Sequence, residues 1–452
     1  MRNYLKIMTM LTLSCGVILS GCNKGGGNEA GGSASSGSGG DEFVIGVAAP
    51  FTGDSSQFGA QIRKGLELFQ DQLNEKGGLK GRKLVLNFQD DAGKADQAQT
   101  VATTLASDDS VLAVIGHFNS SCSLAGKSIY ASAGMVQFSP GSTNVEVTKG
   151  TDYTYRNIFT DKFQGESLAT YAHNVLKKQN AAILYDNDDY GTGLKDSFKA
   201  EAGKLGLNVV SELAYDKNAP DFRSQLSTIQ GVQPQPDVLL IAGLYTQAAN
   251  IARQAEALGM KVQFIGGDGD FSQQLITLGG GSVEGMIVSC PFLFDLGGQK
   301  AKDFAAAFQE KFHTEPDAWA ALSYDAAGMI CEGLSRNGFN REAVLKYLKT
   351  VDSPEHAYSG VVGDTFFDAE GDCKRPVQMA QVKGGKFVAA EQQLTADGQP
   401  ISVEQVRANA EKAAAAQAGP GAEHKPAAGT EPAAGAAEPA AADAATSAAG
   451  AQ

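Results

Sequence analysis

The stretch GAQIRKGLELFQDQLNEKGGLKGRKLVLNFQDD, residues 59–91, joins a helix-like pattern to a strand-like pattern. Its first part carries apolar residues at helical spacing, namely Ile62, Leu66, Phe69 and Leu73. Two glycines follow at 77 and 78, where a helix is expected to end. The next apolar run, 83–91, has the composition of a strand. A helix that leads through glycines into a strand is the repeating unit of an α/β fold.

The same alternation extends from residue 42 to about residue 403. Strand-like runs in the first part are FVIGVAAP (43–50), VLAVIG (111–116) and MVQFSP (135–140), with helical patterns between them. The alternation restarts after about residue 160, with strand-like runs at 181–188, 208–215, 237–243 and 262–267. Strands that alternate with helices pair in parallel, and the helices cover both faces of the sheet. The sequence therefore predicts an α/β protein with two lobes, each built on a doubly wound parallel sheet.

The N-terminus predicts an export signal with a lipid anchor. Residues 1–21 combine a basic start with an apolar core, and Leu19-Ser20-Gly21-Cys22 is similar to the bacterial lipobox, whose cysteine is lipidated. An ordinary secretory signal is the alternative. Residues 22–41 are rich in Gly and Ser and predict a flexible tether. We therefore expect an extracytoplasmic protein, lipid-anchored through Cys22 to a bacterial membrane, on the periplasmic side if the cell is Gram-negative.

The opposite end and the overall composition exclude several classes of function. Residues 404–452 are rich in Ala and Pro and predict a disordered tail, whose role the sequence does not reveal. A net charge of −14 argues against nucleic-acid binding. The first strand–helix turn carries neither a G-x-G-x-x-G fingerprint nor a P-loop lysine, so no nucleotide cofactor is expected.

Cysteines and histidines give no sign of a metal site. The spacing of Cys122, Cys290, Cys331 and Cys373 fits no zinc pattern, and one or two disulfides of undetermined pairing are compatible with an oxidising compartment. The five histidines are scattered, without partners at catalytic or metal-binding spacing. Each is therefore expected to have a structural role.

Small polar residues follow two predicted strands, in AVIGHFNSSCS (113–123) and MVQFSPGSTN (135–144). Ligands of open parallel sheets bind beyond the carboxyl ends of the strands, where the helix N-termini also lie. Hydroxyl groups and backbone N–H groups on two such loops are able to hold a carboxylate. The alternative is that Ser120, Ser121 and Thr143 only cap helices.

A possible site of opposite charge lies in the second lobe. FIGGDGD (264–270) places Asp268 and Asp270 just after a strand, where a carboxylate is able to receive an ammonium group. A solvated turn aspartate is the alternative. Two sites of opposite sign on two lobes would suit a zwitterion such as an amino acid.

The chain resembles the periplasmic branched-chain (Leu/Ile/Val) amino acid binding proteins of ABC transporters. The resemblance spans about Phe43 to Val388 and rests on residues 59–91, VIGHFNSS, FSPGSTN, LYDNDDYGTGL and IARQAEALGMKVQFIGGDG. It implies the type I periplasmic binding fold, with two lobes joined by a three-strand hinge and the ligand in the cleft between them. The first lobe would comprise 42–161 and 291–368, and the second 162–290 and 369–403.

The resemblance also implies a set of ligand contacts. Ser120 and Thr143 would hold the ligand carboxylate, and the Gly141 carbonyl and Asp268 would receive the ammonium group. Tyr190 would close over the ligand from the second lobe. The remaining positions expected in the pocket are Phe58, Phe118, Asn119 and Trp319.

The sequence departs from the family pattern at several of these positions. Asp268 stands where glutamate is usual, Trp319 replaces a smaller aromatic residue, and Leu244 stands where a second tyrosine is frequent. Gly93 and Asn119 occupy the positions of a cysteine pair. The identity of the ligand among neutral amino acids and small amides therefore stays open.

The resulting hypothesis is a monomeric solute-binding lipoprotein without cofactor or catalytic activity. It would capture a neutral, branched-chain amino acid and deliver it to the membrane permease of an ABC importer. One alternative is a ligand-sensing receptor component for amino acids or small amides. A hydrolase is a further alternative, but Ser120 and His117 lack triad spacing and no G-x-S-x-G elbow is present.

Overall fold

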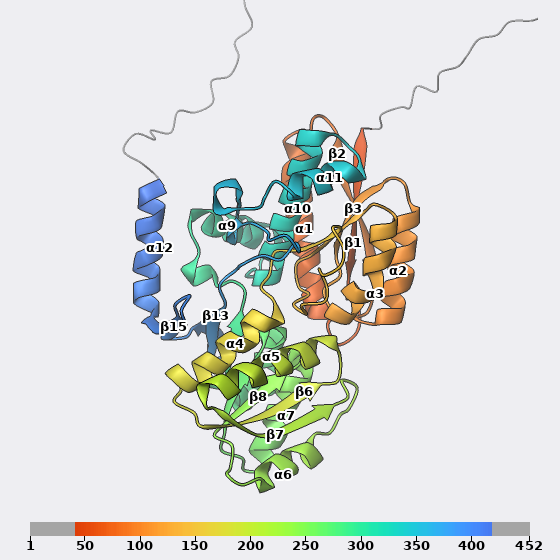
Figure 1. The fold of residues 1–452 in the computed structure, drawn as a ribbon. Helices are drawn as coiled ribbons and strands as arrows, with labels where there is room; N and C mark the ends of the chain where they lie inside the picture. Colours follow the sequence, from red (N-terminus) through yellow and green to blue (C-terminus); the bar gives the residue numbers. More distant parts are fainter. Residues whose placement is uncertain (1–40, 418–452) are drawn as a thin grey trace, which may run out of the picture. The chain divides into compact units, whose positions relative to one another are not determined.

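The computed structural model describes residues 41–417, and side chains through residue 412, as an α/β protein with two main sheets (Figure 1). The first sheet has the order β2-β1-β3-β4-β5 and is parallel throughout. Its strands are β1 (Glu42–Ala49), β2 (Lys83–Asp90), β3 (Val111–Gly116), β4 (Val136–Ser139) and β5 (Thr154–Arg156). The apolar runs from the start of the chain thus form neighbouring strands, with β1 between β2 and β3.

The second sheet has the order β14-β13-β10-β9-β8-β6-β7. It consists of β6 (Asn180–Asp186), β7 (Asn208–Tyr215), β8 (Val238–Ala242), β9 (Gln263–Gly266), β10 (Ile287–Cys290), β13 (Gln378–Lys383) and β14 (Lys386–Ala389). Strands β6 to β10 pair in parallel, and β13 and β14 add an antiparallel edge. The antiparallel edge is formed by a chain segment that returns to this sheet after residues 291–377.

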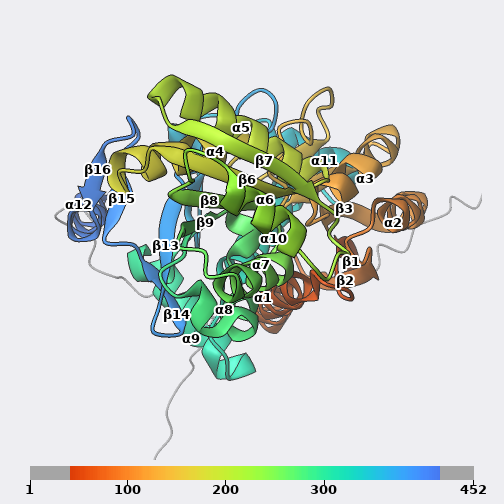
Figure 2. The same cartoon turned by 90° about the horizontal axis from the view of Figure 1, so that it is seen from below.

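Helices connect the parallel strands and cover the sheets (Figures 1 and 2). Those between strands of the first sheet are α1 (Ser56–Glu75), α2 (Ala95–Ser107) and α3 (Ser120–Ser132). Those between strands of the second sheet are α5 (Asp189–Leu205), α6 (Arg223–Gly231), α7 (Tyr245–Ala257) and α8 (Gln273–Gly279). Between β5 and β6 lie α4 (Asp161–Thr170) and the π-helical turn η1 (Tyr171–Val175). Between β10 and β13 lie α9 (Gln299–Phe312), α10 (Ala318–Asn337) and α11 (Arg341–Leu348).

Short elements complete the described chain. They are the 3₁₀ turns η2 (Asp268–Asp270), η3 (Gly280–Val283), η4 (Phe294–Leu296) and η5 (Pro354–His356), and the hairpins β11 (Tyr358–Gly360) with β12 (Gly363–Thr365) and β15 (Gln392–Leu394) with β16 (Pro400–Ser402). The turn η2 directly follows β9, so it places its aspartates at the carboxyl end of a parallel strand.

Helices α1 and α10 pack closely against each other and position two aromatic residues. Gly65 of α1 permits this approach, because a Cβ atom there would lie 2.2 Å from the carbonyl oxygen of Ala320 in α10. Asp317 starts α10 by accepting hydrogen bonds from the N–H groups of Trp319 and Ala320, at 3.0 and 3.1 Å. Phe58 near the start of α1 and Trp319 near the start of α10 are consequently packed together, with ring centroids 5.4 Å apart.

Two buried arginines join the segments that connect the sheets. Arg156, at the end of β5, donates from Nε to Asp372 at 2.7 Å and from Nη1 to the Ser142 carbonyl at 2.8 Å. Arg375 donates from Nε to the carbonyl of Asn157 at 3.0 Å. The chain that leaves the first sheet after β5 is therefore tied to the chain that enters β13.

The C-terminal expectation was wrong over its first residues. Residues 403–417 form the helix α12 (Val403–Gln417), whereas a disordered tail was predicted from residue 404. This segment is rich in alanine, which has the highest helix propensity, and the prolines of the tail begin only at Pro420. Residues 418–452, like the predicted signal, lipidation site Cys22 and tether up to residue 40, lie outside the described residues.

The cysteines do not form disulfides in the described part of the chain. Cys122, Cys290, Cys331 and Cys373 are all buried free thiols. Among residues 41–417, no helix combines the length and apolar character that crossing a membrane requires.

Candidate ligand-binding site

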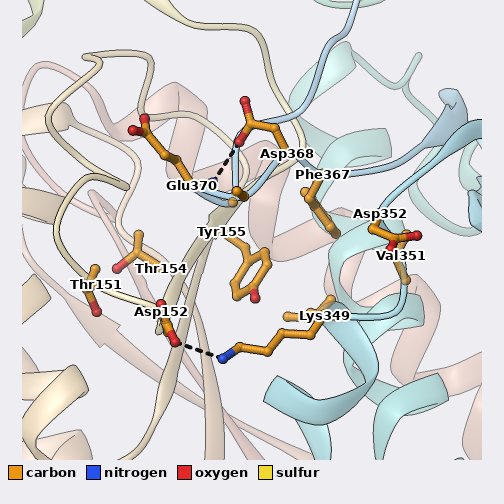
Figure 3. A pocket seen from close by; sticks show the side chains of 13 residues that line it. Thr151, Asp152, Thr154, Tyr155, Lys349, Val351, Asp352, Phe367, Asp368 and Glu370 are labelled. Atoms are coloured by element: carbon orange, nitrogen blue, oxygen red, sulfur yellow. Dashed lines mark hydrogen bonds and ion pairs between the residues drawn. The ribbon is translucent and has the colours of Figure 1, made fainter.

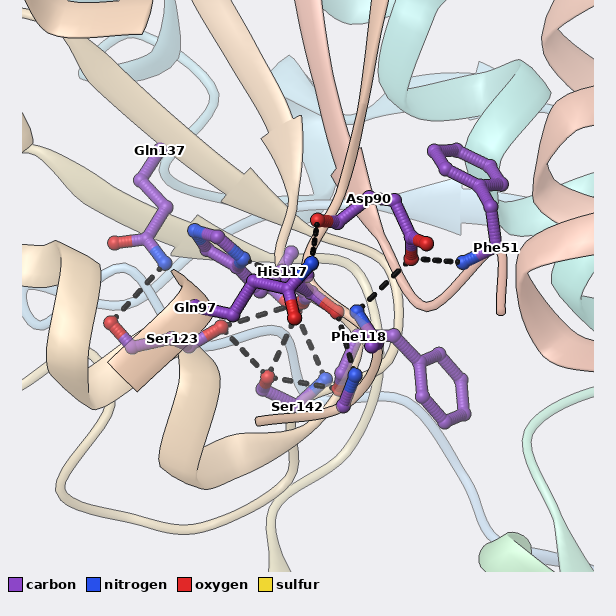
Figure 4. Close-up of polar contacts among 12 residues, drawn as sticks. Phe51, Asp90, Gln97, His117, Phe118, Ser123, Gln137 and Ser142 are labelled. Atoms are coloured by element: carbon purple, nitrogen blue, oxygen red, sulfur yellow. Dashed lines mark hydrogen bonds and ion pairs between the residues drawn. The ribbon is translucent and has the colours of Figure 1, made fainter. Parts of the chain in front are cut away.

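The two loops that follow β3 and β4 are held together by one backbone carbonyl. The hydroxyl oxygens of Ser123, Ser139 and Ser142 lie 3.2, 2.6 and 3.2 Å from the carbonyl oxygen of His117 (Figure 4). Ser139 Oγ also accepts a hydrogen bond from the N–H of Ser142 at 2.9 Å. Loop 117–120 and loop 139–144 therefore form one rigid polar unit at the carboxyl end of the first sheet.

The imidazole of His117 is part of the same support. Its Nδ1 lies 2.6 Å from Asp91 Oδ2, and its Nε2 lies 3.1 Å from the Tyr130 hydroxyl. All three side chains are buried, and Asp91 Oδ1 also accepts from the N–H of Gly93 at 2.9 Å. Because both ring nitrogens are engaged, His117 stabilises the loop and is not placed as a base for Ser120.

The carboxyl ends of both sheets meet at a small cavity. From the first sheet it is lined by Phe118, Asn119, Ser120 and Gly141, and from the second by Tyr190, Leu244, Asp268 and Gly269. Its free volume for the centre of a water-sized sphere is about 10 Å³, which is room for about one water molecule. Six of the nine residues predicted to bind ligand thus share one cavity.

The second-sheet side of this cavity is built around the Asp268 carboxylate. Asp268 Oδ1 accepts hydrogen bonds from Gln164 Nε2 at 2.6 Å and from the Tyr190 hydroxyl at 2.8 Å. The Tyr190 oxygen in turn accepts from the N–H of Gly269 at 3.1 Å. Burial raises the pKa of Asp268 to about 6, although these hydrogen bonds oppose the shift. The group is therefore poised to change its charge near neutral pH.

Tyr190 is brought to Asp268 by the start of α5. Asp188 caps this helix, because its Oδ1 accepts from the N–H of Gly191 at 2.8 Å. Burial and the nearby carboxylate of Asp268 raise the pKa of Tyr190 well above its usual value, so the phenol stays a hydrogen-bond donor.

The hydroxyl groups on the first-sheet side have few internal partners. Ser120 Oγ accepts from the N–H of Asn144 at 3.2 Å, and Ser120 is the first residue of α3. The cap residue of α3 is Asn119, whose side chain makes no capping hydrogen bond. Thr143 is buried, and its Oγ1 has no hydrogen-bond partner in the described chain. The interpretation that Ser120 and Thr143 serve only as helix caps is thus not supported.

Phe58 and Trp319 lie behind the cavity wall and do not line the cavity. Phe58 stacks on Phe118 with ring centroids 4.3 Å apart, and Trp319 meets Phe118 edge-on at 5.0 Å. Trp319 is fully buried and donates from Nε1 to the carbonyl of Phe271 at 3.2 Å. Tyr245 packs edge-on against Phe58 at 5.1 Å. These rings form an aromatic block that fixes the position of Phe118.

Three residues of the site were not among the predicted contacts. Leu244 and Gly269 line the cavity, and Gln164 holds Asp268 from α4. Leu244 and Gly269 follow strands β8 and β9, so the rule that ligands bind beyond strand ends would have included them. Gln164 gave no such signal, because it lies in a helix and is 104 residues away from Asp268 in sequence.

Two larger cavities lie elsewhere. One, of about 390 Å³, is bordered by Asp152, Tyr155 and Lys349, and Lys349 Nζ lies 2.7 Å from Asp152 Oδ2 (Figure 3). It lies at the amino end of β5, opposite the edge where parallel sheets bind ligands. The other, of about 1070 Å³, is lined by parts of α4, α5 and the segments 368–377 and 394–398. Neither contains a predicted site residue.

Comparison with known proteins agrees with this geometry. The profile of a family described as periplasmic binding protein matches residues 42–386, well over half of the 452 residues. The chain belongs to the periplasmic binding protein family. The family membership inferred from the sequence is thereby confirmed.

Two similar proteins carry names that refer to amino acid binding. An "Amino acid binding protein" of Pseudomonas aeruginosa is 32% identical over 340 residues, which cover 74% of this chain and 88% of that protein. "Leu/Ile/Val-binding protein homolog 1" of Brucella abortus is 31% identical over 343 residues, with 75% and 90% covered. The chain shares with these proteins a periplasmic solute-binding role.

Solved structures confirm the expected type I periplasmic binding fold. The leucine binding protein LivK of Thermotoga maritima superposes with a TM-score of 0.73 at 29% identity, covering 80% of this chain and 99% of that one. The substrate binding protein LivJ of Streptococcus pneumoniae, solved in complex with isoleucine, has a TM-score of 0.73 at 25% identity with the same coverage.

Proposed function

We propose that this chain is an extracytoplasmic, lipid-anchored binding protein that captures a neutral, branched-chain amino acid for an ABC importer. The observation that carries the proposal is the cavity between the two sheets. It joins hydroxyl and backbone groups at Ser120 and Gly141 to the carboxylate of Asp268. Hydrogen-bond donors that favour an anion and a carboxylate that favours a cation lie a short distance apart. Together they suit the two charges of an α-amino acid.

In the proposed complex each charge of the ligand has its own partners. Ser120 and Thr143 donate hydrogen bonds to the carboxylate, which is further stabilised by the N-terminus of α3. The Gly141 carbonyl and Asp268 accept hydrogen bonds from the ammonium group. Charge-assisted hydrogen bonds of this kind are about twice as strong as neutral ones, and exclusion of water strengthens them further.

The side chain of the ligand would lie against Phe118 and Leu244. Leucine exceeds alanine by three carbon atoms, so burial of its side chain adds about 2.4 kcal/mol, or about fiftyfold in affinity. The cavity holds about one water, so leucine enters only when the lobes separate or when these two side chains turn aside. Asn119, Phe58 and Trp319 would support the pocket wall from behind or beside Phe118.

Lobe motion is part of the proposal, with the first lobe formed by 42–161 and 291–368 and the second by 162–290 and 369–403. Polar contacts between these ranges that lie away from the connecting segments would break on opening. Asn144 Nδ2 donates to the Asp189 carbonyl at 2.6 Å, and Trp319 Nε1 donates to the Phe271 carbonyl at 3.2 Å. The ties of Arg156 and Arg375 to the connecting segments would persist and serve as the hinge.

The proposed cellular location and transport partner follow from the sequence and the family. Lipidation of Cys22 would hold the protein, as a monomer, on the outer side of the cytoplasmic membrane or on the periplasmic side of the outer membrane. There it would deliver the closed, loaded form to the membrane permease. Binding without chemical conversion is consistent with His117, whose ring nitrogens are both engaged by Asp91 and Tyr130.

The test uses Trp319, the only tryptophan in the chain. After removal of bound ligand by unfolding and refolding, its fluorescence is followed during titration with leucine, isoleucine, valine, phenylalanine and alanine. We expect saturation at ligand concentrations on the order of micromolar or lower for the branched-chain members. Binding should be lost in Asp268→Asn and kept in the control Asp270→Asn, an equally buried aspartate that does not line the cavity. If calorimetry detects no binding of any of the five, the proposed ligand class is wrong.

A further inference from the structure

Asp161 is a buried carboxylate that the proposed site leaves unused. It is the first residue of α4, and its side chain is 1% exposed. Neither of its carboxylate oxygens has a hydrogen-bond partner among residues 41–417. An unpaired carboxylate in a protein interior is costly, and a nearby positive charge is what most effectively compensates it.

The backbone places Asp161 beside the ligand-binding loop. The N–H of Asp161 donates to the carbonyl of Thr143 at 2.7 Å. Thr143 Oγ1 is itself buried and unpartnered in the described chain. The Thr143 hydroxyl and the Asp161 carboxylate, both buried, therefore lie next to each other at the point where the first sheet passes into α4.

The carboxylate of Asp161 also faces the helix that carries Tyr190. A Cβ atom built on Gly193 of α5 would lie 2.7 Å from Asp161 Oδ2, so the carboxylate lies directly against this residue. Gly193 follows Tyr190 by three residues, and residues at this spacing share one face of a helix. Asp161 and Asp268 thus approach the same face of α5, since Tyr190 donates its hydroxyl hydrogen to Asp268.

The number of hydrogen-bond donors on the ligand requires one more acceptor. An ammonium group carries three N–H donors, and the site as proposed offers it the Gly141 carbonyl and Asp268. Asp268 Oδ1 already accepts from Gln164 and Tyr190, which leaves Oδ2 for one N–H of the ammonium group. An unused, buried carboxylate beside Thr143 meets the remaining need.

We propose that Asp161 is a second anionic partner of the ligand nitrogen, so that the site selects primary amines with three N–H donors. This inference rests on the proposed amino acid binding function and adds the class of nitrogen that is recognised. Secondary amines and hydroxy acids of the same shape would leave one or both carboxylates unpaired. Burial raises the pKa of Asp161 well above its usual value, although the Thr143 hydroxyl and the positive charge of Arg156 oppose the shift.

The experiment compares two variants with three ligands. Asp161→Asn removes the proposed partner, and Asp270→Asn is the matched control, because Asp270 is also fully buried with both oxygens unpartnered in the described chain. The ligands are L-leucine, N-methyl-L-leucine and L-2-hydroxy-4-methylpentanoate, which offer three, two and no ammonium N–H donors. Dissociation constants are measured by calorimetry on the refolded full chain, and thermal unfolding checks that each variant folds.

The expected result is a change in discrimination between ligands. Loss of one charged hydrogen bond weakens binding by about tenfold to a hundredfold, so Asp161→Asn should lose that much affinity for leucine and much less for the hydroxy acid. In Asp270→Asn, the ratio of the dissociation constants for leucine and the hydroxy acid should remain that of the wild-type protein. If Asp161 had a purely structural role, its substitution would weaken the binding of all three ligands by the same factor. If Asp161→Asn does not fold, Asp161→Ser, which removes the charge with a smaller side chain, carries the same comparison.

Two outcomes overturn the inference and can be told apart. In the first outcome, the wild-type protein binds leucine, but in Asp161→Asn the ratio of the dissociation constants for leucine and the hydroxy acid stays within about twofold of the wild-type ratio. Asp161 is then not a partner of the nitrogen, and the proposed function stands. If the wild-type protein binds neither leucine nor N-methyl-leucine, the inference and the amino acid function fail together.

Discussion

Replacement of Gly65 by alanine tests the close approach of α1 and α10. The added Cβ atom would lie 2.2 Å from the Ala320 carbonyl oxygen and 2.8 Å from its Cα and carbonyl carbon atoms. These are backbone atoms, so no side-chain rotation relieves the overlap, and the helices must separate by about 1 Å to restore normal contact. Overpacking of this kind costs about 1–3 kcal/mol, whereas alanine gains about 1 kcal/mol in helix propensity.

We expect a net loss of up to about 2 kcal/mol in the free energy of unfolding, measured by urea unfolding followed by circular dichroism. The matched control is Gly203→Ala in α5, where a Cβ atom would meet no atom within 4 Å. At this position the higher helix propensity of alanine acts alone, so Gly203→Ala should raise the free energy of unfolding by about 0.5–1 kcal/mol. Equal stabilisation by both substitutions would refute the helix contact. Because Phe58 and Trp319 stand on these two helices, Gly65→Ala should also weaken ligand binding.

Three further predictions concern the hinge and the site. Asp372→Ala leaves Arg156 buried without its carboxylate and should destabilise by about 3–5 kcal/mol in urea unfolding, whereas loss of the exposed Asp152 carboxylate should cost less than about 1 kcal/mol. Because the pKa of Asp268 is raised to about 6, the ligand-free folded protein retains a proton there that the unfolded chain loses near pH 4. Its contribution to the unfolding free energy should therefore fall as pH rises from about 4 to 6, while affinity for an ammonium ligand rises. Burial also raises the pKa of Asp317 to about 7 and that of Asp325 to about 6. Asp268→Asn should therefore reduce the fall in thermal unfolding without abolishing it, and should leave no rise in affinity by calorimetry. Tyr190→Phe removes a donor to the Asp268 carboxylate and should reduce ligand affinity about tenfold by calorimetry, and an unchanged affinity would exclude a role in closure.

The alternation of strand and helix patterns was sufficient to predict the sheets, because burial on both faces leaves nearly continuous apolar runs such as 111–116. The position of the cavity was also predictable, since the loops after β3, β4 and β9 lie at strand ends. The roles of the individual residues in binding stay predictions.

Other features depend on contacts that sequence patterns do not encode. Gln164 reaches Asp268 from a different helix, and Arg156 reaches Asp372 across 216 residues. Trp319 was expected at the cavity surface but stands behind Phe118, because the stacking of Phe58 on Phe118 occupies the nearer position. The segment 403–417 is helical because the high helix propensity of its alanines outweighs its lack of large apolar residues.

The shared carbonyl of His117 has a consequence for the timing of binding. Three serine hydroxyls around one acceptor hold both first-sheet loops in place before any ligand arrives, so little ordering is needed at first contact. The carboxylate of a ligand would therefore dock first, and the second lobe would follow. Substitutions at Ser120 should then slow association as well as hasten release, whereas those at Asp268 should act almost entirely on residence time.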